Sequence, residues 1–295
     1  MMPPMVGMTE RTIDVGGGIS LHVREMGPAG PAPLVLLLHG FPDCSHTWRH
    51  QLPALAAAGF HAVAPDLRGY DGSSKPKGVA AYSVSALAAD VAGLVAALGA
   101  EQADVVAHDW GGGAAWAFAM RYPERLRRLA ILNAPHPVTL RRHLRSLRQL
   151  KKSWYMFAFQ LPVMPELGLA RNDFASLRQV FRTASLRPGA FSEEDIERHV
   201  EALRPPGALT AALNYYRAAF RNVGPRGPRP RRVDAPVLVL WGDRDRFLGP
   251  ELAENGSEWT PNATVRHVPE AGHWIQHDVP DLVNDELVRF LRDPV

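Results

Sequence analysis

The sequence predicts an α/β protein with a mostly parallel sheet, helices on both faces and a helical insertion. Short runs rich in Val and Leu alternate with helical patterns in the first half of the chain, which is typical of strands buried between helices. The alternation stops after Asn133 and returns at Pro236. We therefore expect residues 1–135 and 233–295 to form the core and residues 136–232 to form an inserted helical cap.

Each expected element rests on a run of apolar residues with its own boundary signal. The predicted strands are Ile19–Met26, Leu34–His39, His61–Pro65, Asp104–Ala107, Leu129–Asn133, Pro236–Trp241 and Thr264–Val268. A helix is predicted from Ser83 to Leu98, because its apolar residues recur at helical spacing and Gly99 stops it. A last helix is predicted from Asp278 to Leu291.

Composition excludes several classes of protein. The 295 residues are 46% hydrophobic, which is enough for a single large core and argues against a disordered chain. The longest apolar run of the core, residues 34–38, is far too short to span a bilayer. The first ten residues do not resemble a secretory signal, so we expect a cytoplasmic protein. Cys44 is the one cysteine, which excludes an internal disulfide and a cysteine-based zinc site.

The charge is uneven along the chain. The net charge of the whole sequence is only +3, but residues 136–232 contain 18 Lys and Arg and 7 Asp and Glu, a net +11. Residues 140–152 predict one helix with an apolar side and a basic side. We interpret the basic side as a solvated surface, with docking on the acidic core or steering of anionic ligands as the alternative. No nucleic-acid-binding motif accompanies it, so a nucleic-acid partner is not expected.

The segment Val105–Gly113 carries the clearest chemical signal. An apolar strand leads directly into His-Asp-Trp-Gly and a helical pattern, as in the sharp strand-to-helix turn called a nucleophile elbow. Asp109 occupies the nucleophile position between the small residues Ala107 and Gly111, and the serine pattern G-x-S-x-G is absent from the chain. A carboxylate nucleophile displaces at an sp³ carbon, which indicates epoxides or alkyl halides as substrates. The alternative role for Asp109 is a helix N-cap.

A hydrolytic second step needs a base, and the base needs an acid to orient it. His273 follows the last predicted strand and is the expected base. Asp243 and Asp245 both follow the preceding strand, so position alone leaves both open as the acid. The backbone N–H groups of Phe41 and Trp110 are the expected oxyanion hole.

Histidines near the chain's first strands suggest no metal centre. His39, in a tight Gly turn, is expected to make structural hydrogen bonds. His46 and His50 are spaced four residues apart, but the H-E-x-x-H zinc pattern fails at Thr47. We therefore expect no metal and no cofactor.

Taken together, these motifs resemble the soluble, cap-containing epoxide hydrolases of the α/β-hydrolase fold. The similarity extends over nearly the whole chain from about Ile19, and it is carried by residues 39–51, 66–74, 108–112 and 272–274. In that family two cap tyrosines hydrogen-bond the epoxide oxygen. The segments 154–162 and 214–217 match their motifs, which implies Tyr155 and Tyr216 rather than the neighbouring Tyr215.

The resemblance also implies the remaining site residues. It favours Asp245 over Asp243 as the acid, because an apolar residue, Phe247, follows two positions later. The expected substrate pocket is lined by an aromatic group: Phe41, Trp110, Phe159 and Trp274.

The implied reaction converts an epoxide and water into a vicinal diol through an ester on Asp109. Two alternatives remain open. A haloalkane dehalogenase resembles this elbow, including Trp110, but usually carries Asn where this chain has Phe41. A non-catalytic ligand receptor on the same fold is disfavoured by the complete set of site residues. An oligomeric state is not readable from the sequence.

Overall fold

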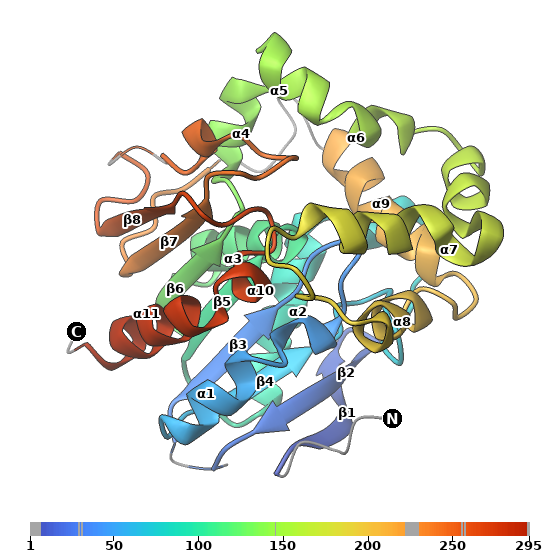
Figure 1. The fold of residues 1–295 in the computed structure, drawn as a ribbon. Coiled ribbons are helices and arrows are strands. Elements are labelled where there is room, and N and C mark those ends of the chain that lie inside the picture. The colour runs from blue at the N-terminus through green and yellow to red at the C-terminus, as the bar shows by residue number, and fades with distance from the viewer. Residues whose placement is uncertain are drawn as a thin grey trace.

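The computed structural model describes residues 7–293 except 29, 31, 145, 222–229, 255 and 257. Its strands form one sheet in the order β1-β2-β4-β3-β5-β6-β7-β8 (Figure 1). The strands are β1 (Thr9–Gly16), β2 (Ile19–Met26), β3 (Leu34–Leu38), β4 (His61–Pro65), β5 (Ala103–His108), β6 (Leu126–Leu132), β7 (Val237–Gly242) and β8 (Ala263–Val268). From β4 through β8 all pairings are parallel, whereas β1 and β2 are antiparallel additions at one edge. The predicted α/β class is confirmed.

The apolar pattern explains which strands the sequence revealed. Every residue of β3, β4, β5 and β7 is buried, so these strands are mainly apolar in sequence, and the polar residues of β4 and β5 are limited to His61, Asp104 and His108. Strand β1 was not predicted. It lies at the edge of the sheet and exposes most of its residues, with only Ile13 buried, so its sequence is mainly polar.

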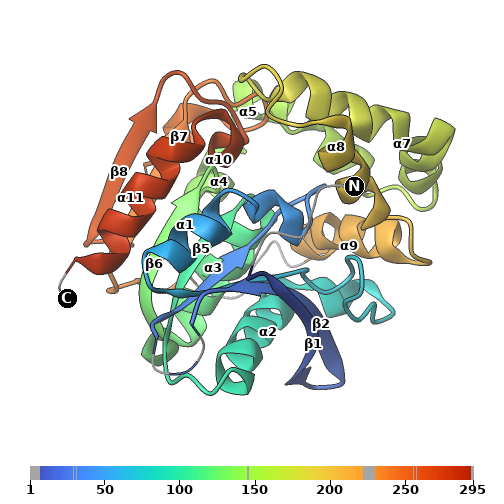
Figure 2. The same ribbon diagram turned by 60° about the horizontal axis from the view of Figure 1, so that its bottom comes forward.

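Helices cover both faces of the sheet (Figures 1 and 2). On one face α1 (Gln51–Ala57), α10 (Ile275–Asp278) and α11 (Pro280–Arg292) pack on one apolar cluster. On the other face α2 (Val84–Ala97) and α3 (Trp110–Arg121) pack on a second apolar cluster. Ser83 caps α2 by accepting a hydrogen bond from Ala86 N, close to the predicted start of that helix. The predicted last helix corresponds to α11, which begins at Pro280, two residues after the predicted start. Asp278 belongs to the short α10, and the chain bends at Val279 between the two helices.

The described part of the segment between β6 and β7 consists of helices joined by loops and contains no strand. It contains α4 (Pro137–His143), α5 (Leu147–Lys152), α6 (Trp154–Ala158), α7 (Met164–Ala184), α8 (Glu193–Glu201) and α9 (Ala208–Arg221). These helices lie together above one end of the sheet (Figure 1). Helix α7 is interrupted at Arg171–Phe174, where the backbone leaves helical geometry. Short 3₁₀ helices occur at Ser45–Trp48, Val79–Tyr82, Pro123–Arg125 and Pro250–Leu252.

The prediction of one basic helix over residues 140–152 was wrong. The structure has two short helices, α4 and α5, with Ser146 capping the second through a hydrogen bond from Gln149 N. Residue 145, between them, lies outside the described residues. The apolar periodicity continues across this break, which is why the pattern suggested a single helix.

Two further features bear on function. None of the described helices combines the length and the apolar character that crossing a membrane requires.

The parallel strands end at a common edge, and the segments that follow β3, β5, β6, β7 and β8 therefore meet there. The helices α4–α9 lie over this same edge (Figure 1).

Candidate active site

Asp109 occupies a strained turn between β5 and α3. Its φ of 49° and ψ of −120° lie where residues with a Cβ are uncommon. Although Asp109 stands at the N-cap position of α3, its side chain makes no capping hydrogen bond, so the N-cap role is not supported. The turn is crowded as well, since a Cβ added at Gly111 would lie 2.2 Å from the backbone oxygen of Leu38. The small residues around Asp109 are therefore a steric requirement.

We expect Gly111→Ala to destabilise the protein by on the order of 3 kcal/mol, because the added methyl group collides with backbone rather than with a movable side chain. Gly113→Ala is the matched control in the same helix. Its added Cβ would meet nothing closer than 3.7 Å, and alanine favours a helix by about 0.5–1 kcal/mol. Urea unfolding of both variants measures the difference, and equal stability of the two would contradict this account of the turn.

The Asp109 carboxylate lies between two predicted partners. Its Oδ1 accepts a hydrogen bond of 2.9 Å from the backbone N–H of Phe41. Its Oδ2 lies 3.8 Å from Nε2 of His273. Gly40 permits the close approach of these chain segments, because a Cβ there would lie 2.4 Å from Cβ of Asp109. Trp110 is the first residue of α3, where a backbone N–H has no acceptor within the helix.

The structure brings Asp245, and not Asp243, to His273. Asp245 Oδ2 lies 2.8 Å from His273 Nδ1, and its Oδ1 accepts hydrogen bonds from the backbone N–H groups of Phe247 and Leu248. Asp243 instead contacts His267 Nδ1 at 2.5 Å, on a partly exposed surface. Burial raises the pKa of Asp245, but the charge and hydrogen bond of His273 outweigh burial and lower it.

Asn133 is a residue that the sequence analysis did not single out. It follows β6 with a φ of 40°, and its Nδ2 donates a 2.8 Å hydrogen bond to Asp245 Oδ2. Its Oδ1 accepts from the backbone N–H of Gly242 at 2.9 Å. Asn133 thus ties the carboxylate of Asp245 to the end of β7. Its place at the carboxyl end of a parallel strand was the available signal.

The ionisation of His273 reflects the carboxylates around it. Burial lowers the pKa of His273, but the negative charges of Asp245 and Asp109 and the hydrogen bond from Nδ1 raise it to about 9. Because Asp109 contributes through its charge, any reaction that neutralises Asp109 removes part of this increase.

A second pair of buried groups lies behind His273 and was also missed. His108 Nε2 donates a 2.9 Å hydrogen bond to the backbone oxygen of His273, and its Nδ1 lies 3.4 Å from Asp43 Oδ2. Trp274 Nε1 donates to both oxygens of Asp43. Burial raises the pKa of Asp43, but the hydrogen bond from His108 and nearby charges lower it to about 2. Asp43 and His108 lie in the segments 39–51 and 108–112 that carry the family resemblance, but their positions in the sequence gave no indication that they contact each other.

The two predicted tyrosines come together from different helices. Tyr155 lies on α6 and Tyr216 on α9, with ring centroids 6.0 Å apart, and the ring of Tyr216 lies 4.8 Å from that of Trp110. Burial and the charge of Asp109 raise the pKa of both phenols, so both remain hydrogen-bond donors at neutral pH. Tyr215 points elsewhere, because its hydroxyl donates to the backbone oxygen of Arg68 at 2.8 Å.

Hydrogen bonds from two polar side chains connect the tyrosine-bearing segments. Gln160 Nε2 donates to the backbone oxygen of Met156 on α6 at 2.9 Å and to that of Tyr216 at 3.4 Å. Arg217, which is buried, donates to the backbone oxygens of Phe159 and Leu161. The Gln and Arg of the two motifs therefore hold α6 against α9.

The predicted pocket aromatics occupy two different environments. Phe41 makes edge contacts with both Phe159 and Tyr216, at centroid distances of 5.8 and 5.6 Å. Trp274 is almost fully buried and packs edge-on against His273 at 5.0 Å. Its contact with substrate stays a prediction. Phe247, noted only as a sequence marker, contacts both Tyr155 and His273, at 5.9 and 5.1 Å.

The histidines considered for other roles make structural contacts. His39 Nδ1 donates to the backbone oxygen of Gly40, and its Nε2 accepts from Leu67 N, which agrees with the structural role expected for it. His46 Nε2 lies 2.7 Å from Asp195 of α8. Among the described residues, His22, Asp66 and Asp71 have potential ligand atoms within 4.8 Å of one another. The two oxygens of Asp66 already bond Ser45 N and His22, so this cluster does not suggest a metal centre.

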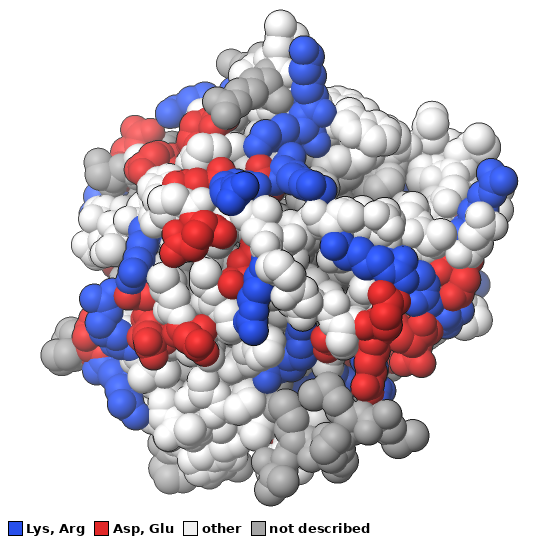
Figure 3. All heavy atoms as spheres, in the orientation of Figure 1, with Lys and Arg blue, Asp and Glu red and all other residues white. Residues whose placement is uncertain are grey.

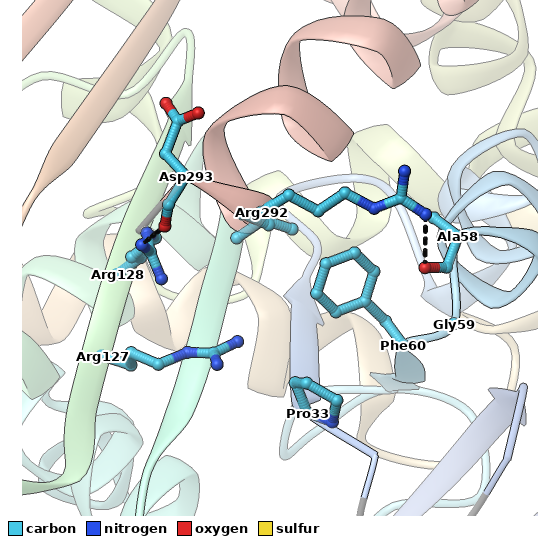
Figure 4. Close-up of a pocket in the computed structure, with 9 residues that line it drawn as sticks. Pro33, Ala58, Gly59, Phe60, Arg127, Arg128, Arg292 and Asp293 are labelled. Carbon is cyan, nitrogen blue, oxygen red and sulfur yellow. Dashed lines mark hydrogen bonds between the residues drawn. The ribbon is translucent and has the colours of Figure 1, made fainter. Parts of the chain in front are cut away.

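A surface pocket of about 420 Å³ lies away from these residues (Figure 4). Its lining includes residues that immediately precede β3 and β4 and the first part of β6, so it opens at the amino end of the parallel strands. Asp109 follows the carboxyl end of β5, at the opposite edge. The arginines of the pocket bond groups of the protein: Arg127 bonds Asp104, Arg128 bonds the Asp293 backbone and Arg292 bonds the Ala58 backbone.

Comparison with known proteins gives a consistent picture. Residues 33–280 match the family model described as alpha/beta hydrolase fold. The chain is 40% identical over 277 residues to the AB hydrolase superfamily protein YfhM of Bacillus subtilis, covering 94% of this chain and 96% of that protein. It is 36% identical to human Epoxide hydrolase 4, covering 94% and 76% of the two chains. The crystal structure of Bacillus megaterium epoxide hydrolase with an inhibitor superposes with a TM-score of 0.87 and 34% identity, over 96% of this chain and 100% of that one.

Proposed function

Because this chain belongs to the epoxide hydrolases of the α/β-hydrolase fold, we propose that it converts epoxides into vicinal diols through a covalent ester on Asp109. The observation that carries this proposal is the position of the Asp109 carboxylate. It lies beside the N–H of Phe41 and His273, and the rings of Trp110 and Tyr216 pack against one another next to it. A carboxylate nucleophile and two neutral phenols together suit a small-ring ether better than an acyl ester.

In the first step the Asp109 carboxylate attacks an epoxide carbon. A new bond from carbon to the carboxylate oxygen forms as the bond from that carbon to the epoxide oxygen breaks. Tyr155 and Tyr216 donate hydrogen bonds to the departing oxygen and supply the proton that makes it a hydroxyl group. Their raised pKa values keep both protons in place until that oxygen becomes basic.

In the second step water cleaves the ester. His273 takes a proton from a water molecule, and the resulting hydroxide attacks the carbonyl carbon of Asp109. Asp245 orients His273 and stabilises its protonated form. The backbone N–H groups of Phe41 and Trp110 stabilise the negative oxygen of the tetrahedral intermediate. The bond from the Asp109 carbonyl carbon to the diol oxygen then breaks, and protonated His273 gives its proton to that oxygen. The remaining proton of the attacking water returns to the tyrosine that lost one in the first step, so the diol leaves and Asp109 is restored as a carboxylate.

A single turnover in ¹⁸O-labelled water tests the proposal. We expect the label to enter the Asp109 carboxylate, because water attacks its carbonyl carbon, and the first diol released to contain an unlabelled oxygen from the enzyme. Mass spectrometry of the diol and of the peptide containing Asp109 measures both. Label that passes directly from water into the first diol, with an unlabelled Asp109, would exclude the covalent route.

Halide release from alkyl halides is the second candidate, since Trp110 beside Asp109 is shared with that chemistry. The same enzyme preparation assayed with short alkyl chlorides and bromides distinguishes the two. We propose that the substrates are a small-molecule epoxide and water. We also propose a cytoplasmic location, for which the support is the sequence of the first ten residues.

The two steps are expected to respond differently to pH. In the free enzyme Asp109 helps to hold the pKa of His273 near 9, and alkylation removes that negative charge. The base of the second step should therefore titrate below 9, and hydrolysis should accelerate as pH rises through that lower value. Alkylation does not need neutral His273, so the ester should accumulate at acidic pH. Rapid-quench measurements of both rates over pH test this, and a hydrolysis pKa at or above 9 would contradict it.

A further inference from the structure

The large apolar side chains that are exposed all gather in one short part of the chain. Among the described residues, every large hydrophobic side chain in the exposed class falls between positions 147 and 167, with exposed fractions from 45% to 77%. They are Leu147, Trp154, Phe157, Leu161, Val163, Met164 and Leu167. We name these residues the apolar cap face. A concentration of this kind marks an interaction surface far more often than scattered single residues do.

Helix α6 shows that this exposure is built into the sequence. Its Met156, and Phe159 just beyond its end, are buried beside the site, as expected of an inward helix face. The opposite side would ordinarily be polar, but it carries Trp154, which is 67% exposed, and Phe157, which is 45% exposed. The helix is therefore apolar on both sides, and the outer side stays largely exposed although Phe157 makes an edge contact with Phe220 at a centroid distance of 5.1 Å.

The surroundings of the apolar cap face are basic. Residues 137–171 contain seven Lys and Arg and one acidic residue, Glu166. Among the basic side chains of this segment that the structure describes, only Lys152 turns inward, where it donates to the backbone oxygen of Asp245. Glu166 is already paired with Arg217 at 2.7 Å. Arg141, Lys151 and Arg171 are exposed. Figure 3 shows Lys and Arg gathered over the α5 region, next to an uncharged area over α6 and the start of α7.

Charge decides which partner fits. A second copy docking face to face would bring two such segments together, each with a net positive charge and with its one acidic residue, Glu166, already paired with Arg217. An anionic bilayer supplies both an apolar layer and negative headgroups at its surface. Tryptophan is especially favourable there, because its ring is apolar and its N–H remains near water.

We propose that the apolar cap face docks on the surface of anionic lipid bilayers, without spanning them. Helix α6 carries Tyr155 on its protected side and Trp154 on its exposed side, so docking would place the cap helix of the site against the bilayer. The proposal does not depend on the identity of the epoxide.

Co-sedimentation with vesicles tests the docking. We expect the full chain to bind vesicles of phosphatidylcholine and phosphatidylglycerol at least about tenfold more tightly than vesicles of phosphatidylcholine alone, and to lose most of that preference in about 0.5 M salt. Met164→Ser/Leu167→Ser should reduce binding at least about tenfold, because it removes exposed apolar groups. Lys151→Ser should weaken binding to the anionic vesicles only, whereas the matched control Lys77→Ser, an exposed lysine elsewhere, should leave it unchanged.

Each variant is compared with the wild type by its melting temperature and by turnover of a water-soluble epoxide, both of which should be unchanged. If the double variant does not fold, Leu147→Ser/Leu161→Ser tests the same surface. Absence of vesicle binding, equal binding to the two vesicle types at all salt concentrations, or equal effects of Lys151→Ser and Lys77→Ser would overturn the proposal. So would a concentration-dependent dimer in analytical ultracentrifugation that the double variant abolishes while vesicles bind neither protein.

Discussion

The His273→Gln variant is expected to form the ester on Asp109 and then stop. In the proposed mechanism, attack on the epoxide uses Asp109 and the two tyrosines, whereas His273 acts on the water of the second step. Loss of a general base slows the step that it serves by roughly 10²–10⁴-fold. Intact mass spectrometry should show the enzyme heavier by the mass of the epoxide, and peptide mapping should place the addition on Asp109.

The acid beside His273 gives a matched control for this result. Asp245→Asn should also slow ester hydrolysis strongly, because an amide in place of the carboxylate no longer stabilises protonated His273. Asp243→Asn, two residues away, should leave hydrolysis unchanged, because Asp243 contacts His267 instead. A His273→Gln enzyme that turns over at the wild-type rate without accumulating an adduct would show that another group is the base. Equal effects of the two aspartate variants would remove Asp245 from the proposed mechanism.

The Tyr155→Phe/Tyr216→Phe variant is expected to lose nearly all epoxide opening. An alkoxide is a poor leaving group, and donors in a water-excluded site stabilise such developing charge by about 2.7–4 kcal/mol each. Each single variant should therefore slow alkylation by about 10²–10³-fold. The alkylation rate of the double variant should fall further than that of either single variant. The fall should be smaller than the two single effects multiplied together, because both hydroxyls act on one oxygen. Single-turnover alkylation measured by rapid quench gives these rates.

Tyr215→Phe is the control for the tyrosine pair. It removes the same hydroxyl group from the adjacent residue of α9, but that hydroxyl bonds the backbone oxygen of Arg68. Stability should fall by about 1 kcal/mol and alkylation should be unaffected. Hydrolysis of an ester formed beforehand should be nearly normal in all four tyrosine variants, which are the two single variants, the double variant and Tyr215→Phe. A double variant that opens epoxides normally would refute the role of the pair, and faster halide release than epoxide hydration by the wild type would favour the dehalogenase alternative.

Local sequence patterns were sufficient for the parts of the site that depend on one segment of chain. The crowding around Asp109 requires small residues at fixed offsets, so the elbow is visible as a motif. The buried parallel strands are visible for a similar reason, because both their faces are apolar. The expected base, His273, follows from its place after the last strand. The tyrosines needed the family resemblance, since aromatic residues at helical spacing ordinarily indicate packing.

By itself the sequence determined the α/β class, and it placed helices between two strands of the sheet and Asp109 at the turn where we propose the nucleophile, because each of these signals lies within one continuous stretch. Position in the sequence left Asp243 and Asp245 both open and the family resemblance favoured Asp245, but only the tertiary structure shows that Asp245 meets His273. It also revealed the contacts of Asn133 and His108 and the second apolar side of α6. These features depend on atoms brought together from strand ends and helices that are distant in the sequence. No periodicity records such contacts, because hydrogen bonds and burial between remote segments depend on how the sheet and cap helices pack.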